Sequence, residues 1–268
     1  MIKFFRKIRQ QLLSENKFTK YILYAFGEIL LVVIGILLAL QINAWNTERL
    51  DREQEIVYLK KLLIDLNRDL EGVQGTIDSH ERHLLNGKIL VDVLGKNNSS
   101  HLITDEIYLN AQKSLELHPE WIANSFGGKF FEVLKIHLFN QTDVTFQELI
   151  ASGKIDIIQN QGLKTAIQEH YPNVQEFQNF QDRIIYTVQN NFRETLIKNN
   201  ISNYNTESYE QLVIKITDKQ GLIVALENYM GLSRAALEGI LYSDYSVKNN
   251  TDFLIQKIET ELNSRITD

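Results

Sequence analysis

The sequence predicts an all-α protein in which a single N-terminal transmembrane helix continues into a long heptad-patterned helix that packs in an extracytoplasmic helical bundle. Three observations predict this class. Only two of the 268 residues are proline, so helices can run far without interruption. Residues 21–40 form an apolar stretch. Beyond it, apolar side chains recur at intervals of three and four residues, as they do on one face of a helix.

The apolar stretch has the length of a membrane span. It carries one charged residue, Glu28, and a bilayer core of about 30 Å needs roughly 20 apolar helical residues. Tyr21, Tyr24 and Trp45 flank it, as aromatic residues do at membrane interfaces. The alternatives are a buried core helix and a cleaved signal peptide. The stretch is longer than the usual apolar core of a signal peptide, and no small-x-small cleavage site follows it, so we expect a retained helix.

Basic residues predict the orientation of this helix. Six lie in the 20 residues before the span and four in the 20 residues after it, which places the N-terminus in the cytoplasm and the body in the periplasm, with the helix in the inner membrane. Apolar residues at helical spacing suggest that the head lies on the inner leaflet, the alternative being a disordered tail that only sets topology. The basic cluster expected at that leaflet is Lys3, Arg6, Lys7 and Arg9.

One face of the predicted membrane helix combines a carboxyl group with small residues. Glu28, Gly35 and Ala39 share this face, and Gly35-x-x-x-Ala39 is a small-residue packing motif. Intramembrane carboxyl groups are costly and often functional. The face predicts helix–helix association. The sharper hypothesis is an ion or proton pathway in an oligomer, and the simpler one is a tolerated glutamate that reaches toward the headgroups.

A heptad seam follows the span. We expect it either to pair with a second copy of the chain or to form the first helix of an intramolecular bundle, and the wide apolar stripe favours the bundle. Extended backward, the same frame meets Gly35 and Glu28, so the anchor and the seam are predicted to be one helix without a break near Trp45. The seam residues are Ile56, Leu59, Leu63, Leu66, Leu70, Val73 and Ile77.

The sequence divides into four predicted segments: 1–20, the basic cytoplasmic head; 21–45, the transmembrane helix; 46–95, the coiled-coil-like helix; and 96–268, the bundle. Within the last segment we expect a short helix closed by Gly153 and an extended connector over 154–159. A helix is expected to end before Pro172, and Asn249-Asn250 is expected to interrupt the chain before the final helix.

Two stretches of the sequence resemble a known family. GEILLVVIGILLALQINAWN follows the basic head, and FQELIASGKIDIIQN leads to a helix ending in EHY. Both are similar to an uncharacterised family of single-pass proteins common in Bacteroidota. The resemblance implies an N-terminal anchor and an extracytoplasmic helical domain, and no activity. The positions that fit its membrane pattern are Gly27, Glu28, Gly35, Gln41, Asn43 and Trp45.

The sequence offers little for catalysis. It has no cysteine, which excludes disulfides and thiolate chemistry, and it carries no nucleotide-binding or hydrolase motif. His80 and His83 are the one close histidine pair, and we interpret them as a solvated polar break in the seam rather than a metal site. Asp65 and Asp69 are expected to form ordinary surface ion pairs. We therefore predict no enzyme, no metal and no cofactor.

Charge and patterning together limit the functional hypotheses. The residues after position 20 carry 22 basic and 33 acidic side chains, so no nucleic acid is expected as a partner. The first hypothesis is a membrane-anchored scaffold or interaction protein that forms a homo-oligomer or an envelope complex. The alternative is an extracytoplasmic ligand-sensing domain that signals through a partner.

Overall fold

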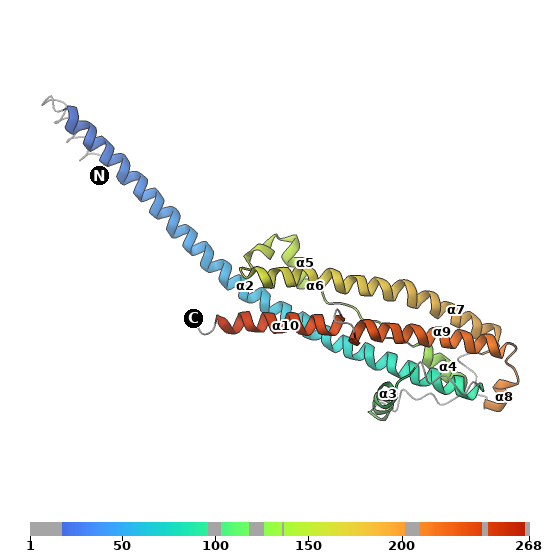
Figure 1. Cartoon of the computed structure of the whole chain (residues 1–268). Helices are drawn as coiled ribbons and strands as arrows, with labels where there is room; N and C mark the ends of the chain where they lie inside the picture. Colours follow the sequence, from blue (N-terminus) through green and yellow to red (C-terminus); the bar gives the residue numbers. More distant parts are fainter. Residues whose placement is uncertain are drawn as a thin grey trace. The chain divides into compact units, whose positions relative to one another are not determined.

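The computed structural model describes residues 18–95, 103–117, 126–135, 137–201, 209–242 and 246–265. Throughout these residues the regular secondary structure is helical, which confirms the predicted all-α class (Figure 1). The chain divides into two compact units, Met1–Val57 and Tyr58–Asp268. The predicted basic cluster of the head lies outside the described residues.

The first unit consists, where it is described, of the beginning of helix α2 (Phe18–Val93). This helix passes Trp45 without a break, as predicted, because residues 18–93 contain no proline that would remove a backbone hydrogen bond. Its most apolar 18-residue window has a mean hydropathy of 2.4, and none of that window is buried. By length and composition, α2 is a helix able to cross a membrane.

The second unit is built on long helical stretches (Figure 1). One is the part of α2 from residue 58 onward. Another consists of α6 (Gln161–Phe180), the π-helical turn η4 (Gln181–Ile185) and α7 (Tyr186–Lys198). The remaining long helices are α9 (Lys219–Leu237), which continues into the π-helical turn η5 (Glu238–Tyr242), and α10 (Val247–Ser264). Helix α9 packs on α7, and α10 packs on α6.

Shorter helices complete the second unit. They are α3 (Asp105–Leu117), α4 (Phe126–Leu134), α5 (Val144–Ala151), the 3-10 helix η3 (Lys154–Ile157) and α8 (Tyr209–Val213). Gly153 follows α5 in the left-handed conformation (φ +68°), so the predicted glycine closure of this helix is confirmed. The extended connector expected over 154–159 is wrong over its first four residues, which form η3 instead.

Two apolar clusters form the core of the second unit. The first joins the later part of α2 to α4, α7 and α9, and it contains Val73 and Ile77 of the seam. The second joins the earlier part of α2 to α5, α6 and α10, and it contains Leu59 and Leu66. These four seam side chains are buried by helices of their own chain. Pairing of the seam with a second copy stays a prediction.

Two predicted helix boundaries are wrong. Helix α6 runs through Pro172 to Phe180. Proline inside a helix costs about 3 kcal/mol, but the continuous helix keeps Tyr171 and Val174 in buried positions on either side of it, which offsets this cost. Asn249 and Asn250 do not interrupt the chain, because Ser246 caps α10 by accepting a hydrogen bond from the Asn249 backbone N–H (3.2 Å).

Candidate functional site

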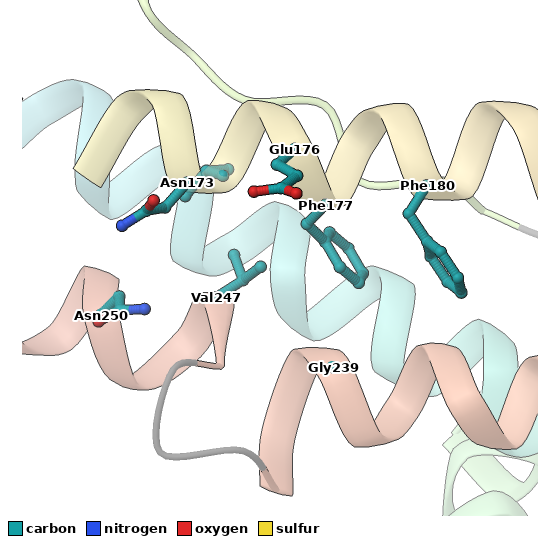
Figure 2. A pocket seen from close by; sticks show the side chains of 8 residues that line it. Asn173, Glu176, Phe177, Phe180, Gly239, Val247 and Asn250 are labelled. Carbon is teal, nitrogen blue, oxygen red and sulfur yellow. The ribbon is translucent and has the colours of Figure 1, made fainter. Parts of the chain in front are cut away.

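A hollow lies between α6, η5 and the start of α10 in the second unit. Its volume is about 470 Å³. Figure 2 shows the α6 side chains above the segment that carries Gly239 and above the first turn of α10. Its lining residues are Asn173, Val174, Glu176, Phe177, Phe180, Gly239, Val247 and Asn250.

The shape of the hollow depends on a glycine. A Cβ placed on Gly239 would lie 3.0 Å from Cε2 of Phe177, closer than nearly all real Cβ contacts. The glycine therefore lets η5 approach the Phe177 ring directly. Phe177 and Phe180 stack with their ring centroids 6.5 Å apart, and the buried Val247 also lines the hollow. This side of the hollow is therefore lined by the aromatic rings of Phe177 and Phe180 and by the apolar side chain of Val247.

The polar groups of the hollow lie toward its other end. Asn173 on α6 and Asn250 on α10 face each other across the opening, with the Glu176 carboxylate nearby (Figure 2). Aromatic rings beside a carboxylate suit an organic cation, which the rings attract through their π faces. The sequence did not single out this site, because its residues come from segments about 70 positions apart and Asn250 was interpreted as a break.

Asp65 and Asp69 are not surface ion pairs, which corrects the expectation from the sequence. They are 8% and 2% exposed. Oδ1 of Asp69 accepts the Thr142 backbone N–H at 2.7 Å, and Oδ2 of Asp65 accepts the Thr145 backbone N–H at 3.2 Å. The only part of the expectation that survives is a 4.0 Å contact from Arg68 to Asp65. The two carboxyl groups attach the entry of α5 to α2.

Burial sets the protonation of this cluster. It raises the pKa of Asp69 to about 6, although the hydrogen bonds from Thr142 act in the opposite direction. It also raises the pKa of Tyr171, and the neighbouring carboxylates of Asp69 and Asp65 add to that shift. Tyr171 stacks on Phe146 of α5 at 4.2 Å between centroids. These groups connect α2, α5 and α6 through hydrogen bonds and ring stacking.

His80 and His83 are also buried, so the solvated polar break expected from the sequence is wrong. They are 0% and 1% exposed. Nδ1 of His83 forms a hydrogen bond with Oγ of Ser233 on α9, and its ring meets Tyr229 edge-on at 4.4 Å between centroids. Both ring nitrogens of His80 and Nε2 of His83 have no hydrogen-bond partner within the described part of the chain.

Metal binding has no geometric support in the described residues. No group of three or more histidine, aspartate or glutamate side chains is arranged there to hold an ion. Glu81, between the two histidines in sequence, accepts a hydrogen bond from Asn110 of α3 at 3.1 Å instead. Burial raises its pKa, and the carboxylates of Asp78 and Glu106 raise it further.

The residues predicted to form a membrane packing face lie on α2 in the first unit. Gly35 and Ala39 are exposed in the single chain, and a Cβ on Gly35 would meet no atom within 4 Å. Glu28 is partly exposed on the same helix. The structure therefore leaves room for a close neighbour along this face, and helix association through it stays a prediction.

Part of the chain is similar to an uncharacterised family. Residues 28–113 match the model of a family described as "Family of unknown function (DUF6090)". The match begins at Glu28, takes in the rest of the apolar stretch and extends into α3. No curated protein and no solved structure matches the chain. The resemblance seen in the sequence is thus supported as far as an uncharacterised domain.

Proposed function

We propose that this chain is a single-pass protein of the inner membrane whose helical body is an interaction module in the periplasm. The observation that carries the proposal is the continuity of α2. Its exposed apolar residues up to Trp45 have the length of a bilayer span, and the same helix supplies core residues such as Leu66 to the second unit. The helix proposed to cross the membrane therefore also contributes side chains to the core of the second unit.

The absence of native cysteine allows a direct test of topology. We would introduce Ser14→Cys in the head and Asn228→Cys at an exposed position of α9, one at a time. In intact cells with a permeabilised outer membrane, a membrane-impermeant maleimide is expected to label the thiol at position 228, and to label the thiol at position 14 only after lysis. Labelling in the reverse order would refute the orientation, and a soluble fraction holding the protein would refute the anchor.

Self-association through the Glu28/Gly35/Ala39 face supports the scaffold part of the proposal. Small residues let two membrane helices approach closely, and exposed Gly35 and Ala39 leave such a surface open. We expect Ala39→Leu to lower the fraction of oligomer on blue native electrophoresis of a mild detergent extract. Ala44→Leu is the matched control, because it lies roughly 140° around the helix. Equal effects of the two substitutions would contradict a specific face.

The hollow at Phe177 favours a second candidate function, a ligand-sensing body that signals through a partner protein. Its rings and the Glu176 carboxylate support binding of an organic cation. We expect primary or quaternary amines to raise the melting temperature of the full chain in detergent, and Glu176→Gln to abolish that rise. Glu169→Gln, also exposed on α6, is the control. Absence of stabilisation by any amine would remove this candidate.

A further inference from the structure

His80 and His83 are buried side chains of α2, three residues apart and therefore neighbours on the helix surface, and His83 contacts α9. Neither histidine has the surroundings that a charged imidazole needs. A buried polar atom is normally hydrogen-bonded, so three ring nitrogens without a partner form an exception that calls for an explanation. A neutral imidazole has one N–H donor and one acceptor nitrogen, so His80 lacks a partner among the described residues for one donor and one acceptor. A protonated imidazole would carry two N–H donors, and for His80 the described residues provide an acceptor to neither of them.

His83 is the member of the pair that contacts α9 directly. His83 bonds to Ser233 and touches Tyr229, both on α9. Tyr229 in turn stacks on Phe192 of α7 at 5.5 Å between centroids. One turn further along α2, a Cβ on Gly87 would lie 2.6 Å from the sulfur of Met230 on α9. The two helices thus approach closely one turn away from His83.

The charged groups near the two histidines form hydrogen bonds with other residues or lie on other helices. On α2, Glu81 is bonded to Asn110 and Arg82 donates to Ser114 of α3 at 3.2 Å. Asp78 accepts a bond from Gln74. The same packed elements also carry other charged groups. They include Asp105, Glu106, Lys113 and Glu116 of α3, Lys129 and Glu132 of α4, Lys135 and His137 beyond it, Arg193, Glu194 and Lys198 of α7, and Lys219, Glu227 and Arg234 of α9.

We propose that His80 and His83 form an acid-sensitive latch, in which protonation of either imidazole releases α9 from α2. A buried cation without an acceptor is unstable, so the charged ring must reach water. On the α9 side it can do so only when α9 moves away, because Ser233, Tyr229 and Met230 cover α2 there. Release would expose the apolar side chains that α2 buries at this level, including Leu84.

The direction of the pH effect follows from the burial. Burial lowers the pKa of His80 from 6.5 to about 4, and it lowers the pKa of His83 well below its usual range, with the charge of His80 adding to the effect. Protons therefore favour the open state as the pH falls below 6.5. The pH effect of Asp69 has the opposite sign, because its raised pKa means that its protonation at low pH stabilises the fold. Its hydrogen bond, however, goes to the entry of α5 and not to α9.

Hydrogen exchange of the full chain in detergent micelles tests the latch. We would compare peptides covering residues 219–237 at pH 7.5 and pH 5.0, after correction for the intrinsic pH dependence of exchange. Titration of His80 between 6.5 and 4 alone raises the opening constant about 30-fold at pH 5. His80→Leu combined with His83→Asn is expected to remove this acceleration, because Asn can keep a hydrogen bond to Ser233. His137→Gln, at an exposed position, is expected to leave it unchanged.

Each result decides the proposal. Acceleration in the natural chain that disappears in the double variant and persists in His137→Gln supports the latch. No acceleration in the natural chain would overturn it, and so would equal acceleration in the double variant. If near-ultraviolet circular dichroism shows that the double variant is unfolded at pH 7.5, His80→Leu alone replaces it, with the same two outcomes. The inference goes beyond the proposed function and does not depend on it.

Discussion

Replacement of Gly87 by alanine should destabilise the protein, although alanine is the better helix former. A Cβ at this position would lie 2.6 Å from Sδ and 2.7 Å from Cγ of Met230, well inside the 3.4 Å at which ordinary contact begins. Met230 is fully buried and cannot swing into solvent. Overpacking typically costs about 1–3 kcal/mol, and contacts this short place Gly87→Ala near the upper end of that range, while the helix propensity of alanine returns about 1 kcal/mol. The expected net loss is about 2 kcal/mol.

The companion variant Met230→Ala reverses the sign. It removes the clashing Cγ and Sδ atoms, so Gly87→Ala in that background should stabilise the protein by about 1 kcal/mol. Gly231→Ala is the matched control, because it is also an interior helix glycine but has no atom within 4 Å of its Cβ. It should stabilise the natural chain by a similar amount.

Urea unfolding of the full chain in non-ionic detergent, followed by circular dichroism, measures the free energy of unfolding of the natural chain, of each variant and of the Gly231→Ala control. The natural chain, the two single variants and the double variant form a double-mutant cycle with an expected coupling of about 3 kcal/mol. Equal losses for Gly87→Ala with and without Met230 would refute the argument, as would a stabilisation equal to that of Gly231→Ala. Either result would mean that α2 and α9 do not meet as closely as the structure places them.

Three further predictions concern buried polar groups and a cap. His170 is buried and burial lowers its pKa to about 4, so its share of stability is lost as the pH falls below 6.5; His170→Leu should lose about 2 kcal/mol less than the natural chain between pH 7.5 and pH 5, measured by urea unfolding. The pKa of Asp69 is raised to about 6, so its ionised form is destabilising above that pH; Asp69→Asn should stabilise the protein by about 1–3 kcal/mol at pH 7.5 and by nothing at pH 3.5, and an unchanged gain across this range would contradict the assignment. Ser246 caps α10, so Ser246→Ala should lower the free energy of unfolding by about 1 kcal/mol while Ser246→Thr, which keeps the hydroxyl group, loses less; equal losses would show that the cap bond contributes nothing.

Local patterns predicted the helices better than their ends. Helix α2 follows from an unbroken run of helix-compatible residues with no proline, and each turn of it depends on neighbours in the sequence. The closure of α5 at Gly153 was also predictable, because a left-handed residue after a helix favours glycine. Pro172 shows the limit of such rules. Its local cost is offset by packing of Tyr171 and Val174, which no local pattern reports.

The residues of the candidate site were largely hidden from the sequence. Glu176 and Phe177 look like ordinary surface and core positions of an amphipathic helix until Gly239 and Asn250 are brought opposite them. Asp65 and Asp69 at i, i+4 spacing beside basic residues resemble a solvated face. In the fold they are buried, and their carboxyl oxygens accept hydrogen bonds from the backbone N–H groups of Thr142 and Thr145.

By itself, the sequence determined that this protein is helical and that its first long helix carries an exposed apolar stretch of membrane-spanning length. Both properties depend on composition and on spacing within one segment. Only the tertiary structure decided which polar groups leave water, because burial depends on helices that are distant in the chain. His83 is polar in sequence, and its burial depends on Tyr229 and Ser233 of α9, which pack against it.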